Sequence, residues 1–215
     1  VLFRSIQQYF ASLAQLTENV SNNYFIDDLI YVIGGDILNM DTFNGTTTSG
    51  TPVENSDKAH KVYAEAFDAL YKGIRFLKER CESLHIMYIP GNHDRLSSYH
   101  LVHALSKAIQ EESIIWHVEY AERKVLKFSN NFFAFEHGDV NTKNSLLVYA
   151  TEFSEQWGST RFRTLYTGHY HKKKTIEYIT EDEVTGFSIK IIPSLSKTDY
   201  WHYHNKFIGS KRAAI

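Results

Sequence analysis

Cysteine is almost absent from this chain of 215 residues, and charges of the two signs nearly balance. The single cysteine, Cys81, excludes a disulfide framework and fits a reducing compartment, for which we expect the cytoplasm. The formal net charge of −2 gives no overall basic field that would attract nucleic acid. No apolar run approaches the ~20 residues of a membrane span, so we expect no membrane partner.

Histidine, in contrast, occurs 11 times, and it is the commonest metal ligand among side chains. Hydrophobic residues make up 43% of the chain and aromatic residues 14%, which is enough for a substantial core. The length suits one domain. The Thr- and Gly-rich stretch 42–56 has no basic residue, which excludes a Walker-type loop, and we expect it to form a mobile rim near the functional site.

Hydrophobic periodicity predicts the secondary structure. Helical spacing predicts helices over residues 6–20, 56–81, 97–110 and 144–157. The expected buried stripe of the second helix consists of Val62, Ala66, Ala69, Leu70, Ile74 and Leu77. Apolar, β-rich runs predict strands at residues 29–33, 84–89, 114–118, 124–128, 132–135 and 162–167. Residues 174–180 and 186–192 are expected to form a hairpin around Glu181-Asp182-Glu183.

The strand at residues 84–89 ends in Pro-Gly and is followed by four polar side chains, Asn92-His93-Asp94-Arg95. Polar groups at the carboxyl end of a buried strand are typical of α/β active sites. The amide oxygen suits a cation, the imidazole can exchange a proton near neutral pH, and the carboxylate can orient that imidazole. The alternative is a polar turn that caps the next helix, with Ser97 or Ser98 as N-cap.

Three further apolar strands end in clusters of the same kind. Gly35-Asp36 follows the strand at 29–33, which is apolar enough to be covered on both faces. His137-Gly138-Asp139 and Gly168-His169-Tyr170-His171 follow two later strands, and His169 and His171 alternate so that both imidazoles share one side of an extended segment. Each cluster alone could be an ordinary turn with a structural histidine. Together, Asp, Asn and His suit Mn, Zn or Fe.

The order of these clusters closely resembles the calcineurin-like metallophosphoesterase family, in the style of phage and bacterial members and, distantly, of DNA-repair exonucleases. The resemblance covers residues 27–171. It implies an α/β (α+β) fold, a two-sheet β-sandwich flanked by helices with a dimetal site at one end. It also implies two divalent cations, for which we expect Mn²⁺ ahead of Fe, Zn or Mg, and a reaction in which a two-metal-activated hydroxide hydrolyses phosphate esters.

The resemblance also implies a role for each motif residue. Asp36 would bridge the two metals, Asn92, His137 and His169 would complete one site, and His171 would contribute to the other. His93 would act at the leaving group, held in place by Asp94. Arg95 could bind the substrate phosphate or form a surface salt bridge.

The chain departs from the family pattern at its start, where an Asp-x-His strand should supply two more ligands. His60 and His85 are poor substitutes. Val1-Leu2-Phe3-Arg4-Ser5 is what the end of a common sequencing adapter encodes, although coincidence is an alternative. We therefore expect residues 1–5 to be read-through and residues 6–215 to be a single domain that lacks its first strand, with truncation at the C-terminus left open. We expect the chain as written to be inactive.

Substrate class is left open between monoesters, diesters and nucleic acid. Lys172-Lys173-Lys174 could meet a nucleic-acid backbone or be a solvated strand end. The run Tyr200-Trp201-His202-Tyr203-His204 could stack bases or be a partly buried strand. A binding or scaffold module on the same fold that has lost the reaction is the alternative function.

Overall fold

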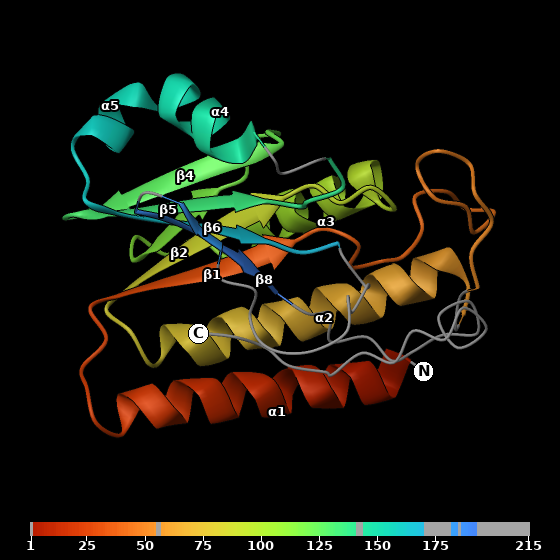
Figure 1. Ribbon diagram of the computed structural model, residues 1–215. Coiled ribbons are helices and arrows are strands. Elements are labelled where there is room, and N and C mark those ends of the chain that lie inside the picture. The colour runs from red at the N-terminus through yellow and green to blue at the C-terminus, as the bar shows by residue number, and fades with distance from the viewer. Residues whose placement is uncertain (1, 55–56, 141–143, 170–181, 185, 193–215) are drawn as a thin grey trace. The chain divides into compact units, whose positions relative to one another are not determined.

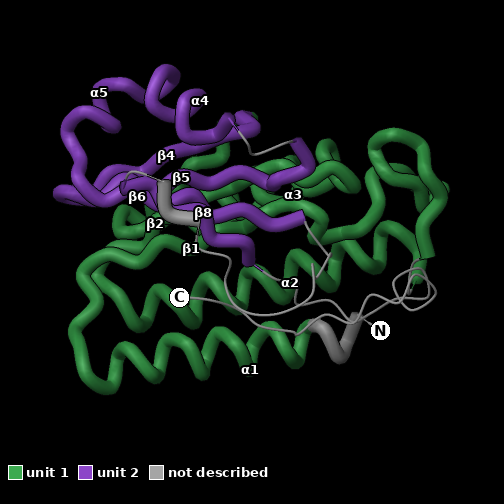
Figure 2. Tube along the Cα trace, viewed as in Figure 1, with its two compact units in different colours: residues 1–120, 195–197, 213–215 green, residues 121–194, 198–212 purple. Residues whose placement is uncertain are grey.

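The computed structural model describes residues 2–54, 57–140, 144–169, 182–184 and 186–192 (Figure 1). The chain divides into two compact units (Figure 2). The described residues up to Tyr120 form unit 1, and those from Ala121 onward form unit 2. Each unit has its own sheet and its own hydrophobic core.

Unit 1 contains a three-stranded parallel sheet in the order β1-β2-β3. Its elements in chain order are α1 (Leu2–Ser21), β1 (Asp28–Gly34), α2 (Ala59–Lys78), β2 (Ser83–Ile89), α3 (Arg95–Ala108) and β3 (Ile114–His117). All six correspond to elements predicted from periodicity. The whole predicted stripe of α2 is buried, because those residues recur on one helix face and pack against the sheet.

The middle strand of unit 1 positions the polar motif that follows it. Leu84, Ile86 and Tyr88 of β2 are fully buried in the unit 1 core with residues of α2 and α3. β1, in contrast, is only partly buried apart from Ile33, which corrects the prediction that both of its faces are covered. The physical reason is that β1 pairs only with β2 among the described strands and is therefore an edge strand.

Unit 2 contains a five-stranded mixed sheet in the order β4-β5-β6-β8-β7. Its elements are β4 (Arg123–Phe128), β5 (Asn131–Glu136), α4 (Ser145–Glu152), α5 (Ser154–Gly158), β6 (Phe162–Thr167), β7 (Asp182–Val184) and β8 (Phe187–Ile191). β5, β6 and β8 run parallel, and β4 and β7 pair antiparallel at the two edges. Parallel neighbours place the ends of β5 and β6 at the same edge of the sheet.

Two predictions about unit 2 need correction. The helix expected over 144–157 is divided into α4 and α5, because Phe153 leaves the helical conformation with φ −120° and ψ 42° while its ring stacks on Tyr149. The hairpin turn was expected at 181–183, but Asp182 and Glu183 lie in β7 and pair with β8. Gly186, with φ +77°, supplies the turn conformation instead. Residues 174–180 lie outside the described part of the chain.

The core of unit 2 is largely aromatic. Phe132 and Leu165 of the sheet and Tyr149 of α4 are completely buried, and Phe132 meets Trp157 edge-on with ring centroids 5.5 Å apart. These contacts hold α4 and α5 against one face of the sheet and thereby support the ends of β5 and β6.

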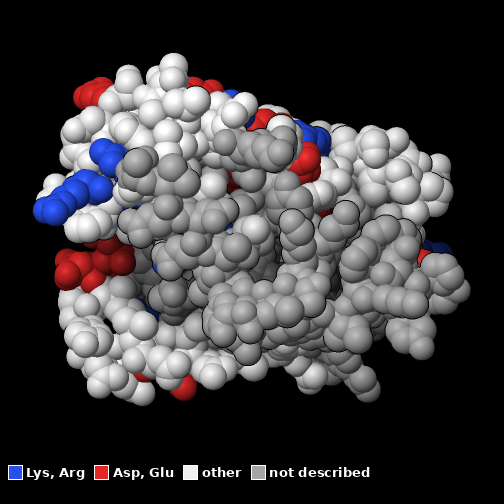
Figure 3. Space-filling model, viewed as in Figure 1, with Lys and Arg blue, Asp and Glu red and all other residues white. Residues whose placement is uncertain are grey.

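The predicted class is confirmed: the structure is mixed α/β, with two sheets and flanking helices. In the described part of the chain, no helix is both long and apolar enough to cross a bilayer. The face drawn in Figure 3 shows the described basic and acidic side chains in small separate groups, as expected for a formal net charge of −2.

Candidate metal centre and adjoining groups

Two glycines bring the ends of β1 and β2 together in unit 1. A Cβ atom on Gly35 would lie 1.9 Å from the backbone nitrogen of Gly91, and one on Gly91 would lie 2.2 Å from the backbone nitrogen of Asp36. The Gly35 N–H donates to the Ile89 carbonyl at 2.8 Å. Only glycine permits this approach, and it places Asp36 directly beside the Asn92-His93-Asp94-Arg95 motif.

Asp94 ties the two loops together from within. Its side chain is completely buried, and its Oδ1 and Oδ2 atoms accept hydrogen bonds from the backbone N–H groups of Asp36 (2.9 Å) and Leu38 (2.8 Å). Burial raises the pKa of Asp94 to about 6, and the charge of Asp36 adds to the increase, while the two backbone donors oppose it. Asp94 therefore fixes the conformation of the loop that carries Asp36.

The Asp36 carboxylate in turn accepts a backbone hydrogen bond from the Asn92-His93-Asp94-Arg95 motif. Its Oδ1 accepts from the backbone N–H of His93 at 2.8 Å. Asp36 and Asn39 have positive φ values of 60° and 62°, which non-glycine residues adopt only where the surrounding structure requires it. Such backbone strain is concentrated at functional sites.

The His93 imidazole is held by Asn39. The Nδ1 atom of His93 lies 3.0 Å from Oδ1 of Asn39, and Nδ2 of Asn39 donates to the Glu54 carbonyl at 3.3 Å. Because an amide oxygen only accepts, Nδ1 of His93 carries the proton, and Nε2 is the ring atom that points away from this contact. We expected Asp94 to hold the imidazole, but both oxygens of Asp94 bind backbone, and Asn39 makes this contact instead.

Asp41 caps α3 from a distant part of the chain. Its carboxylate accepts from the backbone N–H groups of Leu96 (3.0 Å) and Ser97 (2.7 Å) and from the Thr48 hydroxyl (2.7 Å). Partial burial raises the pKa of Asp41, but the bonds from Ser97, Thr48 and Leu96 outweigh it and hold that pKa below its ordinary value. The alternative interpretation, in which Ser97 or Ser98 is the N-cap, is wrong in its cap residue, because α3 begins at Arg95 and includes both serines.

The Thr- and Gly-rich loop lies against the motif, as the sequence suggested. The Thr48 N–H donates to the His93 carbonyl at 3.0 Å, and the Arg95 N–H donates to the Thr48 hydroxyl at 3.1 Å. The Arg95 guanidinium donates to the Tyr120 hydroxyl at 3.2 Å. Asn92, the predicted ligand of the motif, is half-buried.

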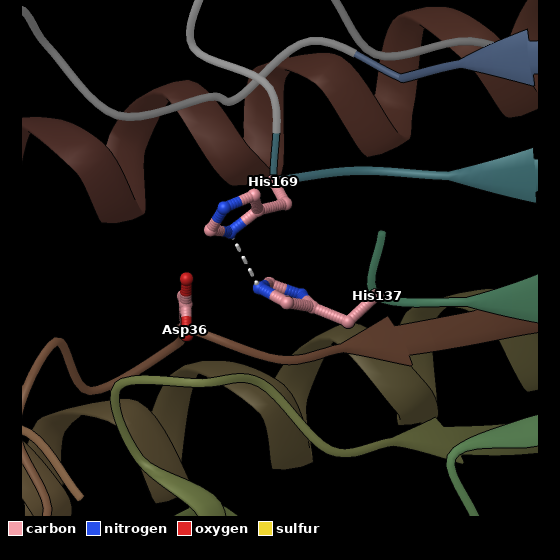
Figure 4. A group of neighbouring side chains, drawn as sticks. All are labelled: Asp36, His137 and His169. Atoms are coloured by element: carbon pink, nitrogen blue, oxygen red, sulfur yellow. Dashed lines mark hydrogen bonds between the residues drawn. The ribbon is translucent and has the colours of Figure 1, made fainter. Parts of the chain in front are cut away.

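In unit 2 the structure brings two predicted ligands together. Nε2 of His137 and Nδ1 of His169 are 3.2 Å apart, and Figure 4 shows both imidazoles pointing toward each other, drawn with Asp36 of unit 1. The cause is the parallel pairing of β5 with β6, which sets Glu136 opposite Thr167 so that each histidine lies just beyond a paired strand end. The Gly168 N–H and the Thr167 hydroxyl both bind the His137 carbonyl.

The geometry of this histidine pair fits a divalent cation. Two nitrogens at ~2.0–2.1 Å from one ion, at a tetrahedral angle, are about 3.4 Å apart, close to the separation of 3.2 Å between these rings. His137 is buried, and His169 has a positive φ of 61°. His137 and His169 each offer one ring nitrogen as a ligand. Imidazole ligands suit Zn, Fe, Cu or Ni.

A half-buried carboxyl group next to His137, that of Glu136, was missed by sequence reasoning. The Tyr149 hydroxyl donates to Oε2 of Glu136 at 3.0 Å, and burial raises the pKa of Glu136, an effect that the Tyr149 bond and the Arg123 charge oppose. Arg123 itself forms a bidentate ion pair with Glu152. The signal in the sequence was the acidic residue at the last position of β5, directly before His137.

Several predicted residues lie outside the described part of the chain. They are His171, Lys172-Lys173-Lys174 and Tyr200-Trp201-His202-Tyr203-His204. The ligand assigned to the second metal therefore stays a prediction.

The comparisons with known proteins yield distant structural similarity alone. No family model matches the chain, and no curated protein matches it. Among solved structures, a single mutant of Vps29 from Entamoeba histolytica is 18% identical with a TM-score of 0.34, over 80% of this chain and 76% of that chain. A double mutant of the same protein is 17% identical with a TM-score of 0.33, over 76% and 74%.

Proposed function

We propose that this chain is a metal-dependent phosphoesterase of the calcineurin-like kind, of the phage or bacterial type, that hydrolyses phosphate ester bonds. The observation that carries the proposal is the His137–His169 pair, whose ring nitrogens are 3.2 Å apart at the carboxyl ends of two parallel strands. A pair of this geometry suits one divalent cation, and the motif of unit 1 supplies a carboxylate and an imidazole of the kind that phosphoryl chemistry uses.

The ligand assignment follows the family resemblance. Asp36, Asn92, His137 and His169 would hold one cation, while Asp36 and His171 would contribute to the second. We propose Mn²⁺ for both positions. Two such cations, when bound, supply a hydroxide nucleophile at neutral pH and offset negative charge on the phosphoryl oxygens.

The protein's own contribution to bond cleavage centres on His93. With Nδ1 donating to Asn39, a protonated His93 presents its Nε2–H to the departing ester oxygen. Transfer of that proton as the phosphorus–oxygen bond breaks contributes typically ~10²–10⁴-fold. Asn39 positions this ring, and Arg95, which is held by Tyr120, is proposed to bind a phosphoryl oxygen of the substrate.

The first test of the proposal is metal binding together with turnover. Mn²⁺ titration of the full chain should show loss of binding in His137→Ala and His169→Ala, with the exposed His100→Ala as a matched control. Hydrolysis is then measured with and without Mn²⁺ on a bis-ester, a monoester and single-stranded DNA. Binding that depends on the two histidines but gives no turnover would identify a binding module in place of an enzyme, and unchanged Mn²⁺ binding in both variants would refute the site.

The second test separates the role of His93 from that of a ligand. His93→Ala should retain the metal content of the parent and lower kcat by ~10²–10⁴-fold on an ester with a poor leaving group. The loss should be much smaller with an activated nitrophenolate, because that group departs without a proton. Loss of metal in His93→Ala would make His93 a ligand and overturn the assignment.

A further inference from the structure

A second group of titratable side chains lies in unit 1, away from the carboxyl ends of β1 and β2. Asp28, His85 and His117 come from β1, β2 and β3 respectively. The parallel register sets Ile30 opposite His85 and Met87 opposite His117, so His85 and His117 are offset by two residues and share one face of the sheet. None of the three is among the residues of the proposed phosphoesterase site.

The three side chains form a chain of close contacts. Nδ1 of His85 lies 3.2 Å from Nε2 of His117, and Nε2 of His85 lies 3.5 Å from Oδ1 of Asp28. The two rings are nearly parallel, with centroids 5.5 Å apart and an interplanar angle of 15°. The outer carboxylate favours the proton on Nε2 of His85, which leaves a lone pair on Nδ1, directed toward His117.

This arrangement has the parts of a metal site with its outer support. Two imidazole nitrogens that bind one Zn²⁺ ion at ~2.0–2.1 Å and a tetrahedral angle are about 3.4 Å apart, and the observed separation is 3.2 Å. A histidine ligand commonly donates its other ring N–H to a carboxylate, which fixes the tautomer and strengthens the ligand. The Asp28 carboxylate lies on that side of His85, with its Oδ1 3.5 Å from Nε2.

We propose that His85 and His117 bind a transition-metal cation, with Zn²⁺ as the fitting ion, and that Asp28 is the positioning residue for His85. Imidazole ligands select Zn, Cu or Ni over Mg or Ca, which prefer oxygen. Access is available, because the His85 side chain is 15% exposed and that of Asp28 is 44% exposed. Water or an incoming ligand completes the coordination.

Calorimetric titration of the full chain with Zn²⁺ tests this site. A His137→Ala/His169→Ala background removes the paired ligands of the other candidate centre. In that background one Zn²⁺ should bind, His85→Ala or His117→Ala should abolish the binding, and Asp28→Asn should weaken it ~10–100-fold. The exposed His100→Ala serves as the matched control and should bind Zn²⁺ like the background.

A second measurement uses the unmodified chain, so its result does not depend on whether the variants fold. Spectra that correlate imidazole protons with ring nitrogens should show Zn²⁺ shifting Nδ1 of His85 and Nε2 of His117, with the ring nitrogens of His100 unchanged. Zn²⁺ binding in the folded His85→Ala and His117→Ala variants equal to that of the background would overturn the proposal. Unshifted His85 and His117 nitrogens at saturating Zn²⁺ would overturn it as well.

Discussion

Substitution of Asp41 by asparagine should weaken the cap of α3 in a way that depends on pH. The Asp41 carboxylate accepts the backbone N–H groups of Leu96 and Ser97, the second and third residues of α3, and the Thr48 hydroxyl. Asparagine retains one acceptor oxygen but loses the charge that favours a helix N-terminus. Loss of a cap costs about 0.5–2 kcal/mol and loss of the charge about 0.3–1 kcal/mol, so we expect Asp41→Asn to lower the free energy of unfolding by about 1 kcal/mol at neutral pH.

The pH dependence follows from the direction of the pKa shift. The folded protein holds the pKa of Asp41 below its ordinary value, so the unfolded state binds more protons in the window between the two values. The stability that Asp41 contributes is therefore fully present above the unfolded pKa of ~3.9 and is lost as the pH falls through the folded pKa. The difference between parent and Asp41→Asn should shrink accordingly on acidification.

Urea unfolding followed by far-UV circular dichroism, from pH 7 down to the acid limit of the folded protein, measures this difference. Asp68→Asn, on an exposed position of α2, is the matched control and should follow the parent at every pH. A parent–Asp41→Asn difference that stayed constant or grew as the pH fell would show that the Asp41 charge does not stabilise α3.

Two further substitutions test the packing that supports the site. Gly91→Ala should lower stability by about 1–3 kcal/mol, because its Cβ would lie 2.2 Å from the Asp36 nitrogen, whereas Gly158→Ala meets nothing within 4 Å and should be neutral by the same unfolding assay. Tyr149→Phe removes the hydroxyl that donates to Glu136 and should cost about 0.5–1.5 kcal/mol. The same change should raise the pKa of Glu136 further, since that bond opposes the increase, and a carboxyl titration by NMR that showed a lower pKa would contradict this.

Strand positions could be predicted from the sequence because apolar runs in this chain are sharply bounded. β1 and β2 were each located to within one residue at either end, where polar residues or Pro-Gly stop the run. The break at Phe153 was not visible, since Phe153 is apolar and continues the helical pattern, and only its packing against Tyr149 explains it. The position of the β7–β8 turn was missed because an acidic run can lie in an edge strand as easily as in a turn.

Residues of the candidate site were found by type, but their partners were not. The sequence indicates that Asp94 matters, yet it does not show that the nearest buried donors are the backbone N–H groups of Asp36 and Leu38. Asn39 became the partner of His93 through a loop conformation with positive φ that no pattern predicts. Contacts between side chains on neighbouring strands could not be predicted either, because they depend on the strand register, which the sequence does not give.

The buried carboxylate of Asp94 should also slow hydrogen–deuterium exchange in the loop that carries Asp36. The amide protons of Asp36 and Leu38 belong to no strand or helix, yet both are bonded to an acceptor that water does not reach. Their exchange with deuterium requires an opening that separates the loop from the end of β2, so they should exchange on the timescale of sheet amides rather than of a surface loop. These two protons can therefore serve as spectroscopic reporters of an intact loop without any ligand, metal or substrate.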